Sequence, residues 1–114
     1  MRSEHLEQVD FVSWFRKVFP DTLIFAIPNG GQRSMTTGAK LKAEGVVAGV
    51  PDLYVPAWNL WIEMKREKGG QLSPKQNGMI EYLSGLPRHE VIVGYGADDA
   101  RNKILVYAER QKKW

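Results

Sequence analysis

The segment GVPDLYVPAWNLWIEMKR, residues 49–66, decides the fold of this chain. It predicts two strands, over residues 52–55 and 60–66, joined by a short loop that begins with proline. A simple four-residue loop places Asp52 opposite Glu63 across an antiparallel pair. Because side chains alternate between the two faces of a strand, one face of this hairpin is uniformly apolar and is predicted to face the core. That face carries Leu53, Val55, Leu60, Ile62 and Met64.

The opposite face of the hairpin carries Asp52, Glu63 and Lys65 together with Tyr54 and Trp61. Carboxylates directly opposite each other have Cβ atoms about 4.5–5.5 Å apart, and like charges so placed destabilise a sheet. A hard divalent cation bound by both carboxylates would remove the repulsion, and Lys65 would contact a water or phosphate oxygen beside it. The alternative is a solvated Glu–Lys pair on an exposed strand, worth under about 1 kcal/mol. Tyr54 and Trp61 are expected either to stack on bases or to pack under a helix.

The rest of the chain alternates between helical and extended patterns, without a linker long enough to divide it. Ser3 and Ser73 are expected N-caps, and Pro74 stands at the first helical position after Ser73. This alternation predicts an α/β fold in which helices flank a mixed central β-sheet. Helices are expected over residues 4–19, 37–44, 74–84 and 97–110, and further strands over residues 22–27 and 90–95.

Length and composition indicate one globular domain over residues 1–114. The chain has no cysteine, which excludes disulfides, thiolate metal sites and cysteine nucleophiles. Sixteen Lys and Arg residues against thirteen Asp and Glu residues give a net charge of +3, so an anionic partner is allowed. The apolar runs are too short to span a membrane, and the first residues lack the apolar core of a signal peptide. We therefore expect no membrane association and a cytoplasmic location.

Pro51-Asp52 followed by Glu63-Met64-Lys65 resembles the signature of the PD-(D/E)XK nuclease superfamily. More specifically, the order of motifs along the chain resembles the virus-type replication-repair nuclease (VRR-NUC) domain. The resemblance covers nearly the whole chain and extends to short stand-alone members, such as those of phages and prophages. The segments that carry it are residues 3–8, 27–31, 41–45, 49–53, 62–65 and 73–76.

This resemblance implies a restriction-endonuclease-like fold and phosphodiester hydrolysis that depends on Mg²⁺ or Mn²⁺. It implies that Asp52, Glu63 and the backbone carbonyl of Met64 are the metal ligands, with water and a substrate phosphate completing the coordination. Lys65 would position the attacking water and stabilise the transition state. The stand-alone members also imply a homodimer similar to junction-resolving enzymes.

Two glutamates of the first predicted helix compete for one further role, that of an acid reaching the metal. The helical spacing favours Glu7, because it shares a face with Phe11, Trp14 and Val18. Glu4 lies one turn earlier and is the alternative. Both residues could instead serve only as favourable charges near a helix N-terminus.

Gln76 has two interpretations. The spacing of Ser73 and Gln76 matches a capping box, in which the Gln side chain bonds back to the N-cap residue. The family resemblance makes Gln76 an active-site residue that contacts water or phosphate. Lys75 is expected to contact phosphate rather than to act as a catalyst.

A second group of residues is expected to contact nucleic acid. The segment of residues 29–31 is a tight turn on sequence grounds, and its consecutive N–H groups could also form an anion-binding nest. Basic side chains nearby would add salt-dependent, sequence-independent affinity for a DNA backbone. The residues of this group are Asn29, Gly30, Gly31, Arg33, Lys40, Lys42 and Lys75.

Together these patterns predict a metal-dependent DNA endonuclease, acting as a homodimer on branched DNA such as four-way junctions in a bacterial or phage-infected cell. The preference for branched DNA follows from the family resemblance and not from a particular residue. Cleavage of flap or duplex DNA is the first alternative. A nucleic-acid-binding module of the same fold without activity is the second, and an unrelated basic scaffold domain is the third.

Overall fold

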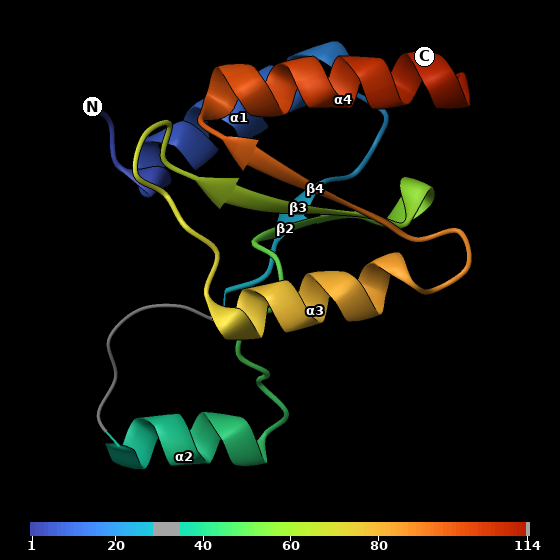
Figure 1. Cartoon of the computed structure of the whole chain (residues 1–114). Helices are drawn as coiled ribbons and strands as arrows, with labels where there is room; N and C mark the ends of the chain where they lie inside the picture. The colour runs from blue at the N-terminus through green and yellow to red at the C-terminus, as the bar shows by residue number, and fades with distance from the viewer. Residues whose placement is uncertain (29–34, 114) are drawn as a thin grey trace.

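The computed structural model describes residues 1–28 and 35–113. It is an α/β fold in which α1 and α4 lie on one face of a sheet and α3 on the other, while α2 lies on the same side as α3 but farther from the sheet (Figure 1). The predicted mixed sheet flanked by helices is therefore confirmed. The elements are α1 (Glu4–Val18), β1 (Phe25–Ala26), α2 (Met35–Ala43), β2 (Leu53–Val55), the 3-10 turn η1 (Pro56–Trp58), β3 (Leu60–Lys65), α3 (Pro74–Ser84), β4 (Glu90–Tyr95) and α4 (Ala97–Gln111).

The strands lie in the order β1-β2-β3-β4. β2 is antiparallel to both β1 and β3, whereas β3 and β4 are parallel, so the sheet is mixed. The β2–β3 register pairs Leu53 with Ile62 and Tyr54 with Trp61, as the sequence predicts. One further step along this ladder places Asp52 opposite Glu63.

The loop between β2 and β3 is a 3-10 turn that is anchored in the core. Trp58 ends this turn, and Asn59 follows in the left-handed region with φ 48°. The Trp58 indole is buried, with its centroid 5.5 Å from Phe15, 5.1 Å from Phe19 and 5.6 Å from Tyr107. The sequence pattern predicts only a connecting loop here. Burial of Trp58 fixes the far end of the hairpin whose other end carries the carboxylates.

The first strand is shorter than expected. The sequence predicts a buried strand over residues 22–27. Of these residues only Phe25–Ala26, the strand β1, pair with β2, and β1 lies at the edge of the sheet. Ile24 is buried, whereas both residues of β1 are exposed. An edge strand pairs on one side only, so its other side carries no ladder bonds to extend it. Immediately after β1, the Ile27 N–H donates to the carbonyl of Asp52 at 2.8 Å and so holds the backbone just before β2.

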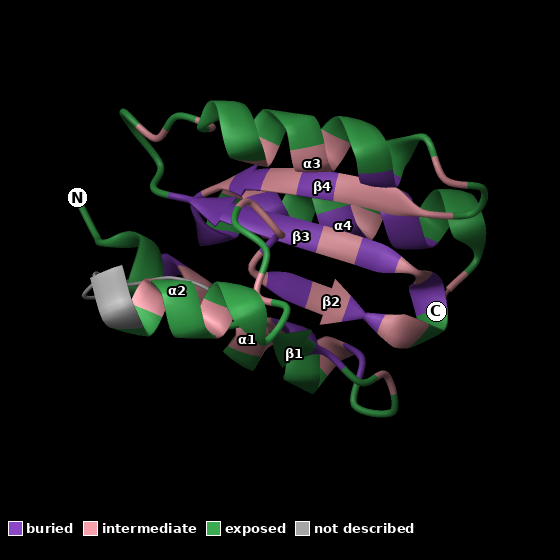
Figure 2. Ribbon diagram, turned by 90° about the horizontal axis from the view of Figure 1, so that it is seen from below, coloured by how far each residue is buried: buried purple, intermediate pink, exposed green. Residues whose placement is uncertain are grey.

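The helices pack on the sheet through small residues and apolar side chains. α4 lies directly on β4, because a Cβ at Gly94 would stand 2.5 Å from the Ala100 Cβ. Buried residues gather along the strands, while the outer faces of α2 and α3 are exposed (Figure 2). Among the residues that the structure describes, no helix is both long enough and apolar enough to cross a membrane.

Candidate active site

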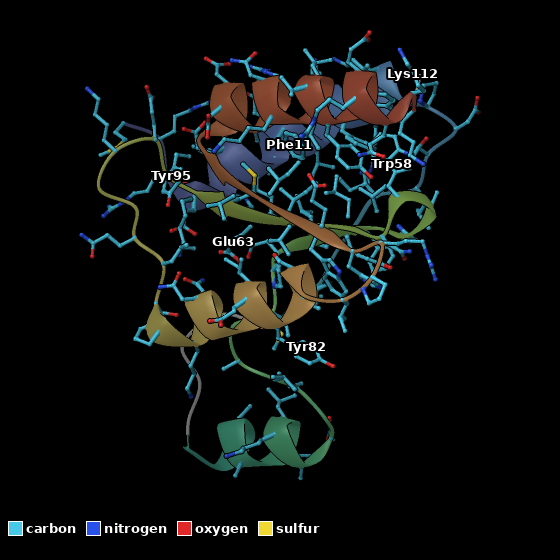
Figure 3. All side chains as sticks on the ribbon, turned by 45° about the vertical axis from the view of Figure 1, so that its right-hand side comes forward. Phe11, Trp58, Glu63, Tyr82, Tyr95 and Lys112 are labelled. Carbon is cyan, nitrogen blue, oxygen red and sulfur yellow. The ribbon has the colours of Figure 1, made fainter. Side chains whose placement is uncertain are left out.

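The two acids of the PD and EMK motifs meet at one end of the β2–β3 hairpin. Glu63 lies in β3, only 2% exposed, on the side of the sheet that faces α3 (Figure 3). Asp52 precedes β2, and its Oδ2 accepts a hydrogen bond from the Met64 N–H at 2.8 Å. This cross-strand bond holds the Asp52 carboxylate beside β3. The register derived from sequence therefore brings the two acids together.

The backbone carbonyl of Met64 lies on the same side of β3 as Asp52. The N–H and C=O of one residue in a strand point to the same side, and the Met64 N–H points to Asp52. The next residue faces the other way, since the carbonyl of Lys65 accepts from the Gly96 N–H at 2.8 Å. Within residues 1–28 and 35–113, no group of three or more His, Cys, Asp and Glu side chains could hold a metal ion. The Met64 carbonyl, which the family resemblance implies as a third ligand, is thus a backbone oxygen directed to the side of β3 on which Asp52 lies.

The electrostatics of the site centre on Glu63. Burial raises the pKa of the Glu63 carboxyl from 4.5 to about 8, and the charge of Asp52 and a hydrogen bond with it add to this effect. The charge of Lys65 lowers the pKa of Glu63, and the charge of Glu4 raises it. Without a cation, the two acids therefore share a site that favours a bound proton.

Lys65 and Gln76 both approach the same oxygen of Glu63. The Lys65 Nζ lies 3.8 Å from Glu63 Oε2, and the Lys65 side chain is buried. The Gln76 Nε2 donates to the same oxygen at 3.1 Å. The site therefore combines two carboxylates, one ammonium group and one amide.

The predicted capping box is present at the start of α3. The Gln76 Oε1 accepts from the Ser73 N–H at 2.8 Å, and the Ser73 Oγ accepts from the Gln76 N–H at 3.1 Å. The cap thus fixes the amide oxygen, which leaves the amide nitrogen directed at Glu63. The two interpretations of Gln76 coexist in one side chain.

The structure places Glu7, the acid of the first helix that was preferred as a metal ligand, at the start of α4, and its contact with a metal stays a prediction. The Glu7 carboxylate is buried, and its Oε1 accepts from the Ala97 N–H at 3.2 Å and from the Arg2 guanidinium at 2.5 Å. Gly96, the N-cap of α4, has no side chain, so Glu7 supplies the missing acceptor. Glu4, the alternative, is the residue of α1 whose charge acts on Glu63.

The predicted nucleic-acid contacts are dispersed. Lys75 is exposed in the first turn of α3, next to Gln76. Lys40 and Lys42 are exposed in the last turn of α2, which stands apart from the sheet (Figure 1). Of the three lysines of this group that the structure describes, Lys75 alone lies next in the chain to a residue that contacts Glu63. Asn29, Gly30, Gly31 and Arg33 lie outside the residues that the structure describes.

Sequence reasoning missed the loop that follows β3. Arg66 and Lys68 are exposed there, directly after the EMK motif. A hollow of about 470 Å³ beside this loop is lined by Arg66 and by Glu4, among others. The signal in the sequence was two basic residues, Arg66 and Lys68, within three positions after Lys65, with Glu67 between them.

Tyr54 and Trp61 pack against each other. Their ring centroids are 4.2 Å apart across β2 and β3. The Tyr54 hydroxyl donates to Asn59 Oδ1 at 2.9 Å, and the Trp61 Nε1–H donates to His89 Nδ1 at 3.2 Å. These contacts stiffen the hairpin on the face that carries the carboxylates.

Comparison with solved structures supports the class of fold that these features define. A protein described as a VRR_NUC domain protein superposes with a TM-score of 0.78 and 26% sequence identity, over 96% of this chain and 90% of that one. No protein-family model matches the chain, and no curated protein matches it. The chain has a nuclease-type, restriction-endonuclease-like fold. The resemblance to the VRR-NUC domain that the motifs predicted is confirmed.

Replacement of Glu7 and replacement of Glu4 by alanine are expected to lower the stability of the protein by different amounts. Glu7→Ala removes the acceptor at the start of α4 and should lower the free energy of unfolding by about 1–3 kcal/mol. Glu4→Ala removes an exposed charge and should cost less than about 1 kcal/mol. Urea unfolding followed by circular dichroism measures both. Equal losses for the two variants would contradict the capping role of Glu7.

The stability of the metal-free protein is expected to fall as pH rises from about 4.5 to about 8. Over this window the unfolded Glu63 loses its proton while the folded one, with its raised pKa, retains it. The Glu63→Gln side chain does not titrate. Between acidic pH and about pH 8, its free energy of unfolding should therefore rise relative to that of the wild type by on the order of 1 kcal/mol or more.

Urea unfolding in EDTA at acidic and at alkaline pH tests this expectation. Glu81→Gln, an exposed position on α3, is the matched control and should show no comparable gain. A stability difference between Glu63→Gln and the wild type that is the same at both pH values would refute the raised pKa.

Proposed function

We propose that this chain is an endonuclease that hydrolyses DNA phosphodiesters with the help of Mg²⁺ or Mn²⁺. The observation that carries the proposal is the meeting of Asp52 with the buried Glu63, with Lys65 and Gln76 both at Glu63 Oε2. Carboxylates that lie opposite each other in a sheet are unfavourable for stability alone. The nuclease-type fold supports a catalytic role for this arrangement.

The donor set fits a hard divalent cation. Asp52, Glu63 and the Met64 carbonyl would hold it, since all three donors are oxygens and the two acids carry excess negative charge. In the metal-free protein, burial raises the pKa of Glu63 to about 8, and the negative charge of Asp52 adds to this effect. When bound, the ion would supply Lewis acidity that polarises the phosphodiester and lowers the pKa of a water.

The remaining side chains have distinct tasks. The Lys65 ammonium offers N–H donors and positive charge to the phosphoryl oxygens as negative charge grows on them. The Gln76 amide donates to Glu63 and holds the orientation of that carboxylate. Burial of Glu63 and Lys65 keeps bulk water away, so these charges act in a medium that screens them weakly.

We propose DNA as the substrate because exposed cations lie close in the chain to Lys65 and Gln76. Lys75 lies on the first turn of α3, and Arg66 and Lys68 lie in the loop after β3. Such side chains neutralise phosphates and give an affinity that falls with salt. The net charge of +3 agrees with an anionic substrate.

Selectivity for branched DNA and a homodimeric state complete the proposal and rest on the family resemblance. A two-fold symmetric dimer would present two sites related by the same symmetry as the paired strands of a four-way junction. The cytoplasm, where such DNA occurs, is the proposed location.

The test is cleavage of labelled four-way junction, flap and linear duplex with Mg²⁺, with Mn²⁺ and with EDTA. We expect metal-dependent cleavage with the junction preferred, and a loss of at least about 10²-fold in rate for Lys65→Ala, with DNA affinity retained. Lys17→Ala, an exposed lysine of α1, is the control and should cleave at the wild-type rate.

Other outcomes would contradict separate parts of the proposal. Binding without cleavage under every metal condition would identify a binding module. Equal cleavage of all three substrates would remove the selectivity for branched DNA. A light-scattering mass of 13.0 kDa, that of a single chain, would contradict the homodimer.

A further inference from the structure

The candidate site is assembled from two elements that are separate in the fold. The carboxylates belong to the β2–β3 hairpin, whereas the Gln76 amide belongs to α3. The body of α3 packs on β4, and the loop from β3 to α3 is exposed over most of its length. A contact near the start of α3 must therefore set the distance between Gln76 and Glu63.

Gly49 makes such a contact. A Cβ built on Gly49 would lie 2.6 Å from the carbonyl oxygen of Lys75, 2.7 Å from its carbonyl carbon and 3.1 Å from the Gln76 nitrogen. All three are backbone atoms of the first helical turn, so they cannot swing aside as the end of a side chain can. The Gly49 backbone thus lies directly against the start of α3, at a distance that no other residue permits.

The position of Gly49 in the chain ties this contact to both parts of the site. It lies three residues before Asp52, separated from it by Val50 and the buried Pro51. On the other side, a Cβ at this position would lie 3.1 Å from the backbone nitrogen of Gln76, the residue that donates to Glu63. The same close approach therefore sets the turn before Asp52 and the turn that carries Gln76 against each other.

We propose that Gly49 is a positioning residue that sets Gln76 against the carboxylate pair. A side chain at this position would displace the first turn of α3, and with it the capping box that directs the Gln76 nitrogen to Glu63. The consequence for catalysis rests on the proposed function, but the consequence for the Gln76–Glu63 contact does not. Gly49 itself touches neither substrate nor metal.

The chain offers a matched control in Gly45. Gly49 has φ +90° and Gly45 has φ +104°, so alanine is strained by its backbone conformation at both positions. A Cβ at Gly45 would meet nothing within 4 Å. The difference between Gly49→Ala and Gly45→Ala therefore isolates the close approach to α3.

Two measurements test the proposal. The first is the ¹⁵N–¹H spectrum of the metal-free protein, in which the Gln76 side-chain amide is assigned by its loss in Gln76→Ala. Gly49→Ala should shift this resonance, whereas Gly45→Ala should leave it in place. The second is Mn²⁺ affinity followed by electron paramagnetic resonance. It should weaken by on the order of 10-fold or more in Gly49→Ala and stay at the wild-type value in Gly45→Ala.

Identical effects of the two alanines on both measurements would overturn the positioning role. If Gly49→Ala does not fold, the wild type is measured instead. A cross-relaxation peak is expected between a Gly49 Hα and the Gln76 backbone N–H. Its absence would overturn the contact. A wild type that neither binds Mn²⁺ nor cleaves DNA would refute the proposed function, while the Gln76 resonance would still test the positioning.

Discussion

Repulsion between the Asp52 and Glu63 carboxylates is the constraint on which the rest of the site depends. The hairpin register brings these acids together, and burial of Glu63 removes the water that would screen its charge. Three groups oppose this cost: the Met64 N–H at Asp52, the Gln76 amide and the Lys65 ammonium at Glu63. The pKa of Glu63 is nevertheless raised to about 8, first by burial of its carboxyl and then by the charge of Asp52. The fold thus holds a pair of acids that still lacks positive charge.

The surrounding structure makes this arrangement rigid. Trp58 anchors the far end of the hairpin in the aromatic core, and the Tyr54–Trp61 pair stiffens the face that carries the acids. The close approach of Gly49 sets α3 against the turn before Asp52. A site held from several directions retains its geometry despite internal repulsion, as catalysis by fixed charges requires.

The sequence predicted most of what depends on local pattern. The hairpin register followed from strict alternation across a short loop, and the capping box followed from the spacing of Ser73 and Gln76. The role of Glu7 could not be predicted, because its partner Ala97 lies ninety residues away in the chain. Burial of Trp58 likewise depends on helices that the loop sequence does not specify. Helical periodicity showed that Glu7 faces inward but not what it meets there.

Calorimetric titration of the protein with Mn²⁺ near neutral pH, in buffers of different ionisation enthalpy, tests the central claim most directly. Because Glu63 holds a proton there in the absence of metal, binding should displace it. The account predicts one ion per chain, release of about one proton, and loss of binding in Asp52→Asn. Absence of binding, or binding without proton release, would contradict it.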